Sequence, residues 1–458
     1  MIPSEEVSTL AAALATLPAD EPAAAGDVHA RRRDRFMAAI GDGVAVLASA
    51  PELVRSRDTA IRFRQDSYFH YLTGFDEPGV AILTPHDPAH RLTLFVRPRD
   101  PDREVWDGAR AGVDGARERY GADAAYPLAE LGQRLKELVE PASELFYALG
   151  SSPRLDGRIV ALLKEFRLKR SRSGKGPADV RDPSLILDAM RVVKGPEEVE
   201  LVRRAARLSA QGHLAALRAA HPGVGEWELE AAIESTFRAA GPDCGPAYPS
   251  IVCSGPNATV LHYAALDRRA AAGELVLIDA GAAVSLYCGD ITRTFPVSGR
   301  FTAPQRAVYD VVLAALEAGI AAVRPGAPFS DLHAAVLRVL VEGMVELGLL
   351  SGEVDALIEQ EGYKRFYMHQ TSHWLGLDVH DAGDYRARAG DWLPLRPGMV
   401  LTVEPGLYVA ADAEDVPDEL RGIGVRIEDD VLVTESGHEV LTRDVPVAAE
   451  ELEALIGR

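Results

Sequence analysis

Apolar residues in the first third of the chain recur in short runs that are separated by polar, Gly-rich and Pro-rich stretches. Three of these runs have the length of buried strands, and they alternate with segments of helical periodicity. Strands are predicted at residues 44–49, 80–85 and 91–98, and helices at residues 31–40, 129–139 and 157–168. Strands interleaved with helices in this way predict a small α/β domain.

Two stretches lack this pattern. The first 25 residues are rich in Ala, Pro and Glu, which predicts a flexible N-terminal extension over residues 1–25. Residues 169–184 are rich in Gly, Ser and Arg and predict an exposed loop just before a domain boundary. No strand and helix frame this basic run, which disfavours a phosphate-binding loop. We therefore expect a first domain at residues 26–188 and a second at residues 189–458.

The second half of the chain begins with long helical patterns that carry their own start and stop signals. Pro196 suits the first turn of a helix that ends at a His-Pro-Gly stop. Thr302 and Gln305 are spaced as a capping box, and Ser330 is expected to cap the helix that follows. Strands with acidic and histidine residues fall between and after the helix pairs. We expect an α+β architecture in which helices pack outside a curved, mostly antiparallel sheet, with the polar cluster on its inner face.

Composition narrows the class of protein. A chain of 458 residues exceeds one ordinary core, and 47% hydrophobic with 26% charged residues is typical of a soluble globular protein. The formal net charge, 49 − 69 = −20, disfavours nucleic acid and anionic membranes as partners. No apolar run reaches the roughly 18 residues of a membrane span, and the N-terminus lacks the basic region of a signal peptide. Three cysteines without CxxC spacing fit a reducing compartment, so we expect a cytoplasmic protein.

Two predicted strands, residues 274–280 and 287–295, each carry one aspartate at an otherwise apolar or strand-forming position. If the hairpin pivots near residues 284 and 285, Asp279 and Asp290 face each other, roughly 5 Å apart at Cβ. Two buried carboxylates at such a distance repel unless they share a proton or hold a cation. The hairpin therefore predicts either a shared proton or a metal site.

Three later segments add imidazoles and carboxylates in apolar surroundings, at residues 369–381, 402–408 and 424–430. Alternation along a strand places Arg426 on the same face as Glu428. Arg426 is therefore expected on the metal side, where it compensates carboxylate charge or binds a substrate carbonyl or carboxylate. Two Asp, one or more His and two Glu make a donor set for two hard or borderline divalent ions.

Competing catalytic signatures fail. His369 and His373 are spaced i, i+4, but Gln370 stands where the HExxH motif needs Glu. The sequence contains no GxSxG elbow. Cys288 lies two residues before Asp290 and is interpreted as a small core residue rather than a neighbour of the metals. Three further histidines fall in or at the ends of predicted helices and are interpreted as ordinary residues: His213, His221 and His333.

These residues resemble a known family. The segments YPSIVCSGPNATVLHY, LVLIDAG, GDITRTFPVSG, SHWLGLDVHD, GMVLTVEPGLY and RGIGVRIEDD, with RQDSYFHYLTGFDEPG in the first half, are similar to bacterial aminopeptidase P, the Xaa-Pro aminopeptidase. The resemblance runs from about Arg31 to the end. It implies a creatinase-like N-terminal domain followed by a pita-bread metallopeptidase domain. It also implies an exopeptidase that hydrolyses the N-terminal Xaa-Pro bond of peptides with two divalent ions. Manganese is the expected metal, with zinc or cobalt as alternatives, and the expected assembly is a homo-oligomer, a tetramer or a dimer.

The resemblance also implies a role for individual residues. It makes Asp279 a terminal ligand of one ion, gives His373 and Glu404 to the other ion, and makes Asp290 and Glu428 the bridges between the two. It implies that His262 and His380 contact the substrate and stabilise the intermediate, that His369, Tyr408 and Arg426 surround the proline, and that Trp106 reaches a neighbouring subunit's active site. Trp106 lies in a Gly/Ala-rich segment that reads as a loop, where a large apolar side chain needs a partner surface. The alternative is that Trp106 packs within its own domain.

The chemistry of such a site follows from elementary considerations. A water that bridges two cations becomes hydroxide near neutral pH, and it is the expected nucleophile. Glu404 is placed to carry the proton to the leaving nitrogen, which gives it a catalytic role besides ligation. A bond before proline has no N–H, so recognition must rely on the ring. Two alternatives remain: a prolidase, which accepts only Xaa-Pro dipeptides, and a non-catalytic binding protein, which loss of metal ligands would mark.

Overall fold

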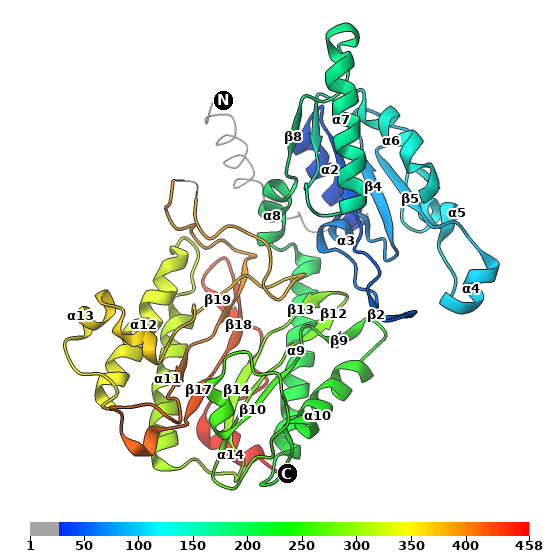
Figure 1. Ribbon diagram of the computed structural model, residues 1–458. Helices are drawn as coiled ribbons and strands as arrows, with labels where there is room; N and C mark the ends of the chain where they lie inside the picture. Colours follow the sequence, from blue (N-terminus) through cyan, green and yellow to red (C-terminus); the bar gives the residue numbers. More distant parts are fainter. Residues whose placement is uncertain (1–26, 388, 458) are drawn as a thin grey trace. The chain divides into compact units, whose positions relative to one another are not determined.

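The computed structural model describes residues 27–387 and 389–457. The chain divides into two compact units, one that ends at Met190 and one that begins at Arg191 (Figure 1). The expected N-terminal extension, residues 1–25, lies outside the described residues. Both units mix helices with sheets, so the α+β prediction is confirmed. No helix in the described ranges is long and apolar enough to cross a membrane.

A mixed sheet forms the centre of the N-terminal unit, and its described strands have the order β6-β5-β4-β1-β7-β8. The strands β1, β4 and β5 pair antiparallel, whereas β6, β7 and β8 join in parallel. Every residue of β4 and β5 is buried, which explains why these strands are continuous apolar runs rather than alternating ones. The strand bounds are β1 Val44–Ala48, β2 Val54–Ser56, β3 Thr59–Ala60, β4 Gly79–Leu83, β5 Leu92–Val96, β6 Ala124–Pro127, β7 Glu144–Phe146 and β8 Asp179–Arg181.

The helices of this unit show where sequence patterns mislead. The expected loop at residues 169–184 is wrong, because α7 continues to Ser173 and β8 pairs with β7. A three-residue edge strand is too short to show a periodic pattern. Trp106, expected in a loop, lies in α4, whose N-cap Asp100 accepts a hydrogen bond from the N–H of Arg103. The helix bounds are α2 Val28–Ile40, α3 Ser67–Thr73, α4 Pro101–Asp107, α5 Gly112–Glu118, η1 Leu128–Glu130, α6 Leu131–Val139, α7 Pro153–Ser173 and α8 Ser184–Val192.

In the C-terminal unit, every strand pairing among the described residues is antiparallel. The sheets have the orders β10-β11-β14, β13-β12-β9, β15-β18-β19 and β16-β17. Figure 1 shows the strands between α9 and α10 on one flank and α11 and α12 on the other. The expected arrangement of helices outside a mostly antiparallel sheet is therefore confirmed. The strand bounds are β9 Cys244–Pro246, β10 Ile251–Ser254, β11 Leu275–Asp279, β12 Ala282–Val284, β13 Tyr287–Cys288, β14 Thr292–Pro296, β15 Val400–Val403, β16 Gly406–Tyr408, β17 Gly424–Arg426, β18 Asp429–Val433 and β19 His438–Val440.

The helix starts predicted for this unit agree with the structure at Thr302 but not at Ser330. Thr302 and Gln305 form the predicted capping box, and α11 begins at the next residue after Thr302. The cap predicted at Ser330 is wrong, because α12 begins one residue earlier, after Pro328. The helix bounds are α9 Pro196–Ala219, α10 Glu226–Ala239, η2 Gly255–Thr259, α11 Ala303–Ala322, α12 Phe329–Glu346, α13 Val354–Glu359, η3 Gly362–Arg365, η4 Asp418–Leu420 and α14 Ala449–Leu455.

The register predicted for the aspartate hairpin is wrong by two residues. The turn consists of Ser285 and Leu286, both with positive φ, so Asp279 lies opposite Thr292 rather than opposite Asp290. Positive φ at both central residues matches the twist of a two-residue hairpin. The strands come very close between the aspartates, where a Cβ at Gly281 would lie 1.7 Å from the carbonyl oxygen of a facing glycine. Only a residue without a side chain fits there.

A buried ion cluster anchors the loop that follows His373. Asp381 binds Lys194 at 3.0 Å and Arg191 at 2.5 Å, and all three side chains are almost fully buried. The backbone N–H of Asp381 donates to the carbonyl of Trp374 at 2.9 Å, and this bond closes the loop on itself. Arg191 at the end of α8 and Lys194 just after it thus fix the loop that carries His380.

This cluster makes a stability prediction. Replacing Asp381 by Ala leaves Lys194 and Arg191 buried without their shared partner, and we expect a loss of about 3–5 kcal/mol in the free energy of unfolding. Asp378→Ala is the control, because Asp378 also binds Arg191 at 2.8 Å but is partly exposed, and its loss should cost less than about 1 kcal/mol. Denaturant unfolding of both variants measures the difference. Equal costs for the two variants would contradict this account of the loop.

Candidate active site

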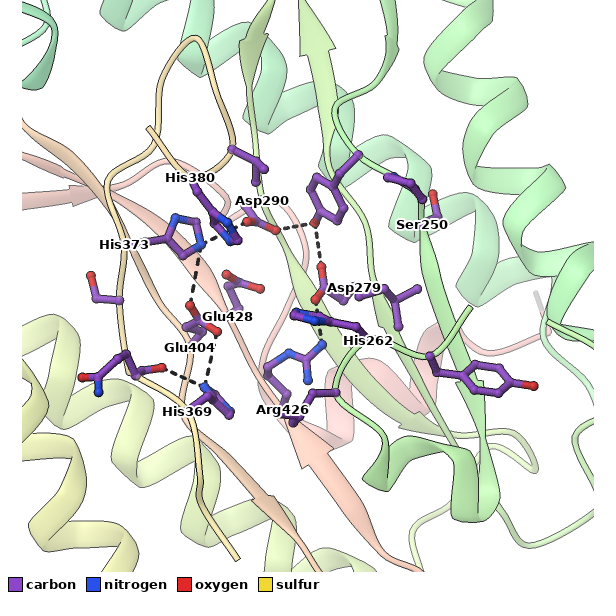
Figure 2. Close-up of a pocket in the computed structure, with 18 of the residues that line it drawn as sticks. Ser250, His262, Asp279, Asp290, His369, His373, His380, Glu404, Arg426 and Glu428 are labelled. Carbon is purple, nitrogen blue, oxygen red and sulfur yellow. Dashed lines mark hydrogen bonds and ion pairs between the residues drawn. The ribbon is translucent and has the colours of Figure 1, made fainter. Parts of the chain in front are cut away.

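Three buried or half-buried side chains that could ligate a metal form the centre of the site. The ligating atoms of Asp290, His373 and Glu428 all lie within 4.8 Å of one another. Asp290 lies two residues before β14, and Glu428 lies between β17 and β18, where it bridges to Thr292 of β14. The Thr292 hydroxyl donates to Glu428 Oε2 at 2.6 Å. Two strands from distant parts of the sequence thus place two carboxylates together (Figure 2).

Asp279 joins this centre through a residue that sequence reasoning missed. The hydroxyl of Tyr248 contacts Asp279 Oδ1 at 2.6 Å and also contacts Asp290. Burial and the neighbouring carboxylates raise the pKa of Tyr248 well above its ordinary value, so it remains a donor. Tyr248 lies in the coil between β9 and β10, inside one of the segments that carry the family resemblance, and no periodic or spacing signal singled it out.

His373 is oriented towards the carboxylates. Its Nδ1 lies 3.0 Å from the carbonyl of Trp374, which fixes the proton there, and Nε2 lies 3.5 Å from Asp290 and 3.6 Å from Glu404. These two distances exceed an ordinary hydrogen bond. A histidine held by a backbone carbonyl at one nitrogen and aimed at carboxylates with the other has the usual arrangement of a metal ligand.

The electrostatics favour a cation at this position. Burial, with repulsion from its carboxylate neighbours, raises the pKa of Asp290 and raises that of Glu428 further. Burial raises the pKa of Glu404 to about 7. Burial lowers the pKa of His373, but Asp290 and Glu404 outweigh burial and raise it to about 9. The carboxylates cannot all ionise without positive charge among them. Oxygen donors with one imidazole are a suitable set for such an ion.

A hydrogen-bonded chain of three side chains borders the carboxylates. Arg426 donates from Nη2 to Asp279 at 2.7 Å and from Nη1 to the Tyr408 hydroxyl at 3.0 Å. The Tyr408 hydroxyl lies 2.8 Å from His369 Nε2. Burial, with the nearby charge of Arg426, lowers the pKa of His369 to about 4, so the ring is neutral and accepts from Tyr408. Arg426 therefore lies on the carboxylate side of its strand, as alternation predicted.

The site opens into a cavity of about 1170 Å³. His369, His373 and His380 approach from one side, and Figure 2 shows His262 on the other side of the carboxylates. The rings of His373 and His380 meet edge to face, with centroids 4.5 Å apart. Aromatic side chains cover another wall and pack on one another: Phe329, Tyr385 and Trp392.

The structure brings most of the predicted site residues together. The nine that line the cavity are His262, Asp279, Asp290, His369, His373, His380, Glu404, Arg426 and Glu428. Tyr408 is joined to two of them by hydrogen bonds. Trp106 belongs to the N-terminal unit, where its side chain is 85% exposed.

Arg293 is a second residue that sequence reasoning missed. It is fully buried in β14 and donates to the backbone carbonyl of Glu428 at 2.7 Å and to Asp429 at 2.8 Å. It thereby ties the strand after Asp290 to the segment that holds Glu428. An arginine inside an otherwise apolar strand was the signal available in the sequence. His213 also supports the site, because its Nε2 lies 2.9 Å from the carbonyl that follows Asp279.

Known proteins share this sequence and fold. Residues 29–147 match the model of the aminopeptidase P N-terminal domain, and residues 200–435 match the model of metallopeptidase family M24. The Xaa-Pro aminopeptidase of Escherichia coli (strain K12) is 43% identical over 432 residues, which cover 93% of this chain and 96% of that protein.

Solved structures agree. The structure of Pseudomonas aeruginosa aminopeptidase PepP is similar with a TM-score of 0.90 at 46% identity, over 93% of this chain and 97% of that chain. Zinc-substituted Escherichia coli aminopeptidase P in complex with product is similar with a TM-score of 0.89 at 43% identity, over 94% of this chain and 97% of that chain. With an M24 unit that follows the N-terminal domain of aminopeptidase P, this chain belongs to the aminopeptidase P group of metallopeptidase family M24.

Proposed function

We propose that this protein hydrolyses the N-terminal Xaa-Pro bond of peptides with the help of two divalent ions, manganese being the preferred metal. The observation that carries the proposal is the cluster of Asp290, His373 and Glu428, with Asp279 and Glu404 beside it, at the base of a large cavity. The 43% identity to an Xaa-Pro aminopeptidase supports the substrate class. A set of four carboxylates and one imidazole suits manganese, while zinc and cobalt remain alternatives.

The five ligands divide naturally between two ions. Asp290 and Glu428 both belong to the central cluster and are the proposed bridges. His373 and Glu404, whose side chains face each other at 3.6 Å, would hold one ion. Asp279, on the Tyr248 side of the cluster, would hold the other. When bound, the two ions supply the nucleophile, by lowering the pKa of a bridging water, and polarise the scissile carbonyl.

The remaining steps fall to side chains. The Glu404 carboxylate would carry a proton from the attacking water to the leaving proline nitrogen. His262 and His380, on opposite sides of the carboxylates, would donate hydrogen bonds to the carbonyl oxygen as negative charge develops on it. Asp279 would also receive the free amino group of the substrate, because an ammonium is the natural partner of a carboxylate. This accounts for release of a single residue from the amino terminus.

Recognition of proline is assigned to the Arg426–Tyr408–His369 chain. The bond before proline is a tertiary amide, so no N–H is available for an enzyme to bind. Neutral His369 lines the cavity and would present a flat surface to the pyrrolidine. Tyr408, held by Arg426 through its hydroxyl, would keep the His369 ring aligned. The same surface would accept dipeptides, so a prolidase is the alternative that peptide length must decide.

We also propose a cytoplasmic homo-oligomer, a dimer or tetramer, whose substrates are peptides rather than nucleic acids or membranes. The buried cysteines, which form no disulfide among the described residues, and the net charge of −20 support this setting. Trp106 and its neighbour Val105 are more than 80% exposed on α4. Two adjacent large apolar side chains in water are unusual unless another surface covers them. We propose that this surface borders the active site of another subunit.

The substrate proposal makes a direct prediction. Peptides of the form X-Pro-Y should lose their first residue, whereas N-acetylated peptides should be resistant, because Asp279 then has no ammonium to bind. X-Ala-Y peptides should react at least about 100-fold more slowly, since they lack the ring that the pocket recognises. Chromatographic measurement of the released residue tests all three. Exclusive cleavage of X-Pro dipeptides would identify a prolidase. Efficient cleavage of acetylated peptides would contradict both the aminopeptidase and the prolidase hypothesis.

The proposed assembly makes a prediction about peptide length. Trp106→Ala should lower kcat/KM at least about 10-fold for pentapeptides but less than about 2-fold for tripeptides, because the wall it supplies is remote from the metals. Leu168→Ala, which removes another exposed apolar side chain of the N-terminal unit, is the matched control. It should change kcat/KM for neither pentapeptides nor tripeptides. Light scattering at assay concentration gives the oligomeric state. A fully active monomer would rule out the arrangement.

A further inference from the structure

The loop that carries His262 leaves β10 at Ser254, passes through η2 and returns at Arg268. In its middle, Leu261 and His262 line the cavity. No hydrogen bond of the His262 side chain is found within residues 27–387 and 389–457. The position of this imidazole therefore depends on how the loop itself is held.

One buried carboxylate holds both ends of the loop. On the entry side, Glu226 Oε1 accepts from the N–H of Ser254 at 2.7 Å, from the Ser254 hydroxyl at 2.8 Å and from Asn257 Nδ2 at 3.1 Å. On the exit side, Glu226 Oε2 accepts from the hydroxyl of Tyr263 at 2.9 Å and from the N–H of Arg268 at 3.1 Å. Tyr263 is the residue directly after His262, so the last of these anchors lies next to the imidazole.

The charge of Glu226 is compensated mainly by these donors. Its side chain is 1% exposed, and the guanidinium of Arg268 is engaged with Glu274 through two bonds of 2.5 Å. Glu226 is also the first residue of α10, a 14-residue helix, where the helix dipole favours negative charge. A buried carboxylate costs free energy unless its oxygens are fully hydrogen-bonded. Here five donors converge on two oxygens, which specifies a single conformation of the loop.

We propose that Glu226 is a positioning residue for His262: it fixes both ends of the 254–268 loop and thereby aims the imidazole into the cavity. This inference rests on the proposed function, in which His262 contacts the substrate. Nothing in the chemistry of hydrolysis requires Glu226 itself, because it is buried beneath the loop and is not among the residues that line the cavity. Its effect on catalysis is exerted through the loop that carries His262.

The isosteric Glu226→Gln is the informative variant. An amide keeps the volume but replaces one acceptor oxygen with an NH₂ group that faces donors, so at least two of the five bonds are lost. The loop should loosen while α10 and the carboxylate cluster stay in place. Glu234→Gln is the matched control: it removes a charge from the same helix at a position where the carboxylate pairs with Arg238.

The test is a double-mutant cycle with two readouts. Glu226→Gln should lower kcat/KM for X-Pro-Y peptides at least 10-fold in the native background but less than 2-fold in a His262→Ala background. Hydrogen exchange should rise in residues 254–268 of Glu226→Gln and stay unchanged in residues 369–381. Glu234→Gln should leave both readouts unchanged. An equal loss of activity in both backgrounds, or unchanged exchange in the loop, would overturn the proposal.

A second variant and an independent readout allow for misfolding of Glu226→Gln and for a lack of peptidase activity. If Glu226→Gln does not fold, Tyr263→Phe carries the same comparison, because it removes one hydroxyl that Glu226 shares with Asp267. The expected loss is about 3-fold, and His262→Ala should abolish it. If the native protein fails to cleave X-Pro-Y peptides, the proposed function is wrong, but hydrogen exchange still reports whether Glu226 holds the loop. Failure of the positioning role of Glu226 can thus be distinguished from failure of the proposed peptidase activity.

Discussion

The crowding of carboxylates beneath one cavity is the constraint on which the rest of the structure depends. Asp290 and Glu428 are buried within 4.8 Å of each other, and Asp279 and Glu404 lie beside them. Water cannot screen charges at this depth, so the folded chain either keeps protons on these groups or supplies positive charge. The pKa values of Asp290 and Glu428 are raised because ionising these buried, neighbouring groups costs free energy. Divalent ions remove this cost, which links the fold to the chemistry of a metallopeptidase.

The scaffold around the cluster serves to hold groups that repel one another. Arg293 bonds to the backbone at Glu428, Arg426 to Asp279, and the Tyr248 hydroxyl to both aspartates. Arg293 and Arg426 lie in strands, and Tyr248 lies in the short connection between β9 and β10, so the carboxylates are held in place by the sheet and its adjoining coil. The histidines are held differently, on loops that are tied down by buried charges: Asp381 with two cations behind His380, and Glu226 with five donors behind His262. Carboxylates held by the sheet, with histidines on anchored loops, would suit the proposed site, which must hold metal ions and still admit a peptide.

The sequence predicted the elements better than the contacts between them. Continuous apolar runs identified β1, β4 and β5, and the Thr302–Gln305 spacing located the start of α11, because these signals are local. The register of the aspartate hairpin was missed by two residues, since it depends on left-handed conformations at Ser285 and Leu286 that neither residue type announces. Trp106 was placed in a loop because its Gly/Ala-rich neighbours obscured the Asp100 cap. For the site, ligating residue types in apolar segments pointed to side chains that the fold brings to one cavity. Tyr248, Arg293 and Glu226 were missed because their importance comes from partners far away in the sequence.

The most direct test of this account is the number of metal ions that the cluster holds. Elemental analysis of manganese-reconstituted protein should give two ions per chain, and anomalous diffraction should place both against Asp290 and Glu428. Asp290→Asn, which keeps the volume of a proposed bridge but removes its charge, should lower the occupancy to one or none while the fold is retained. A saturated native protein with a single ion, or an Asp290→Asn variant with two, would contradict the claim that carboxylate crowding organises this site.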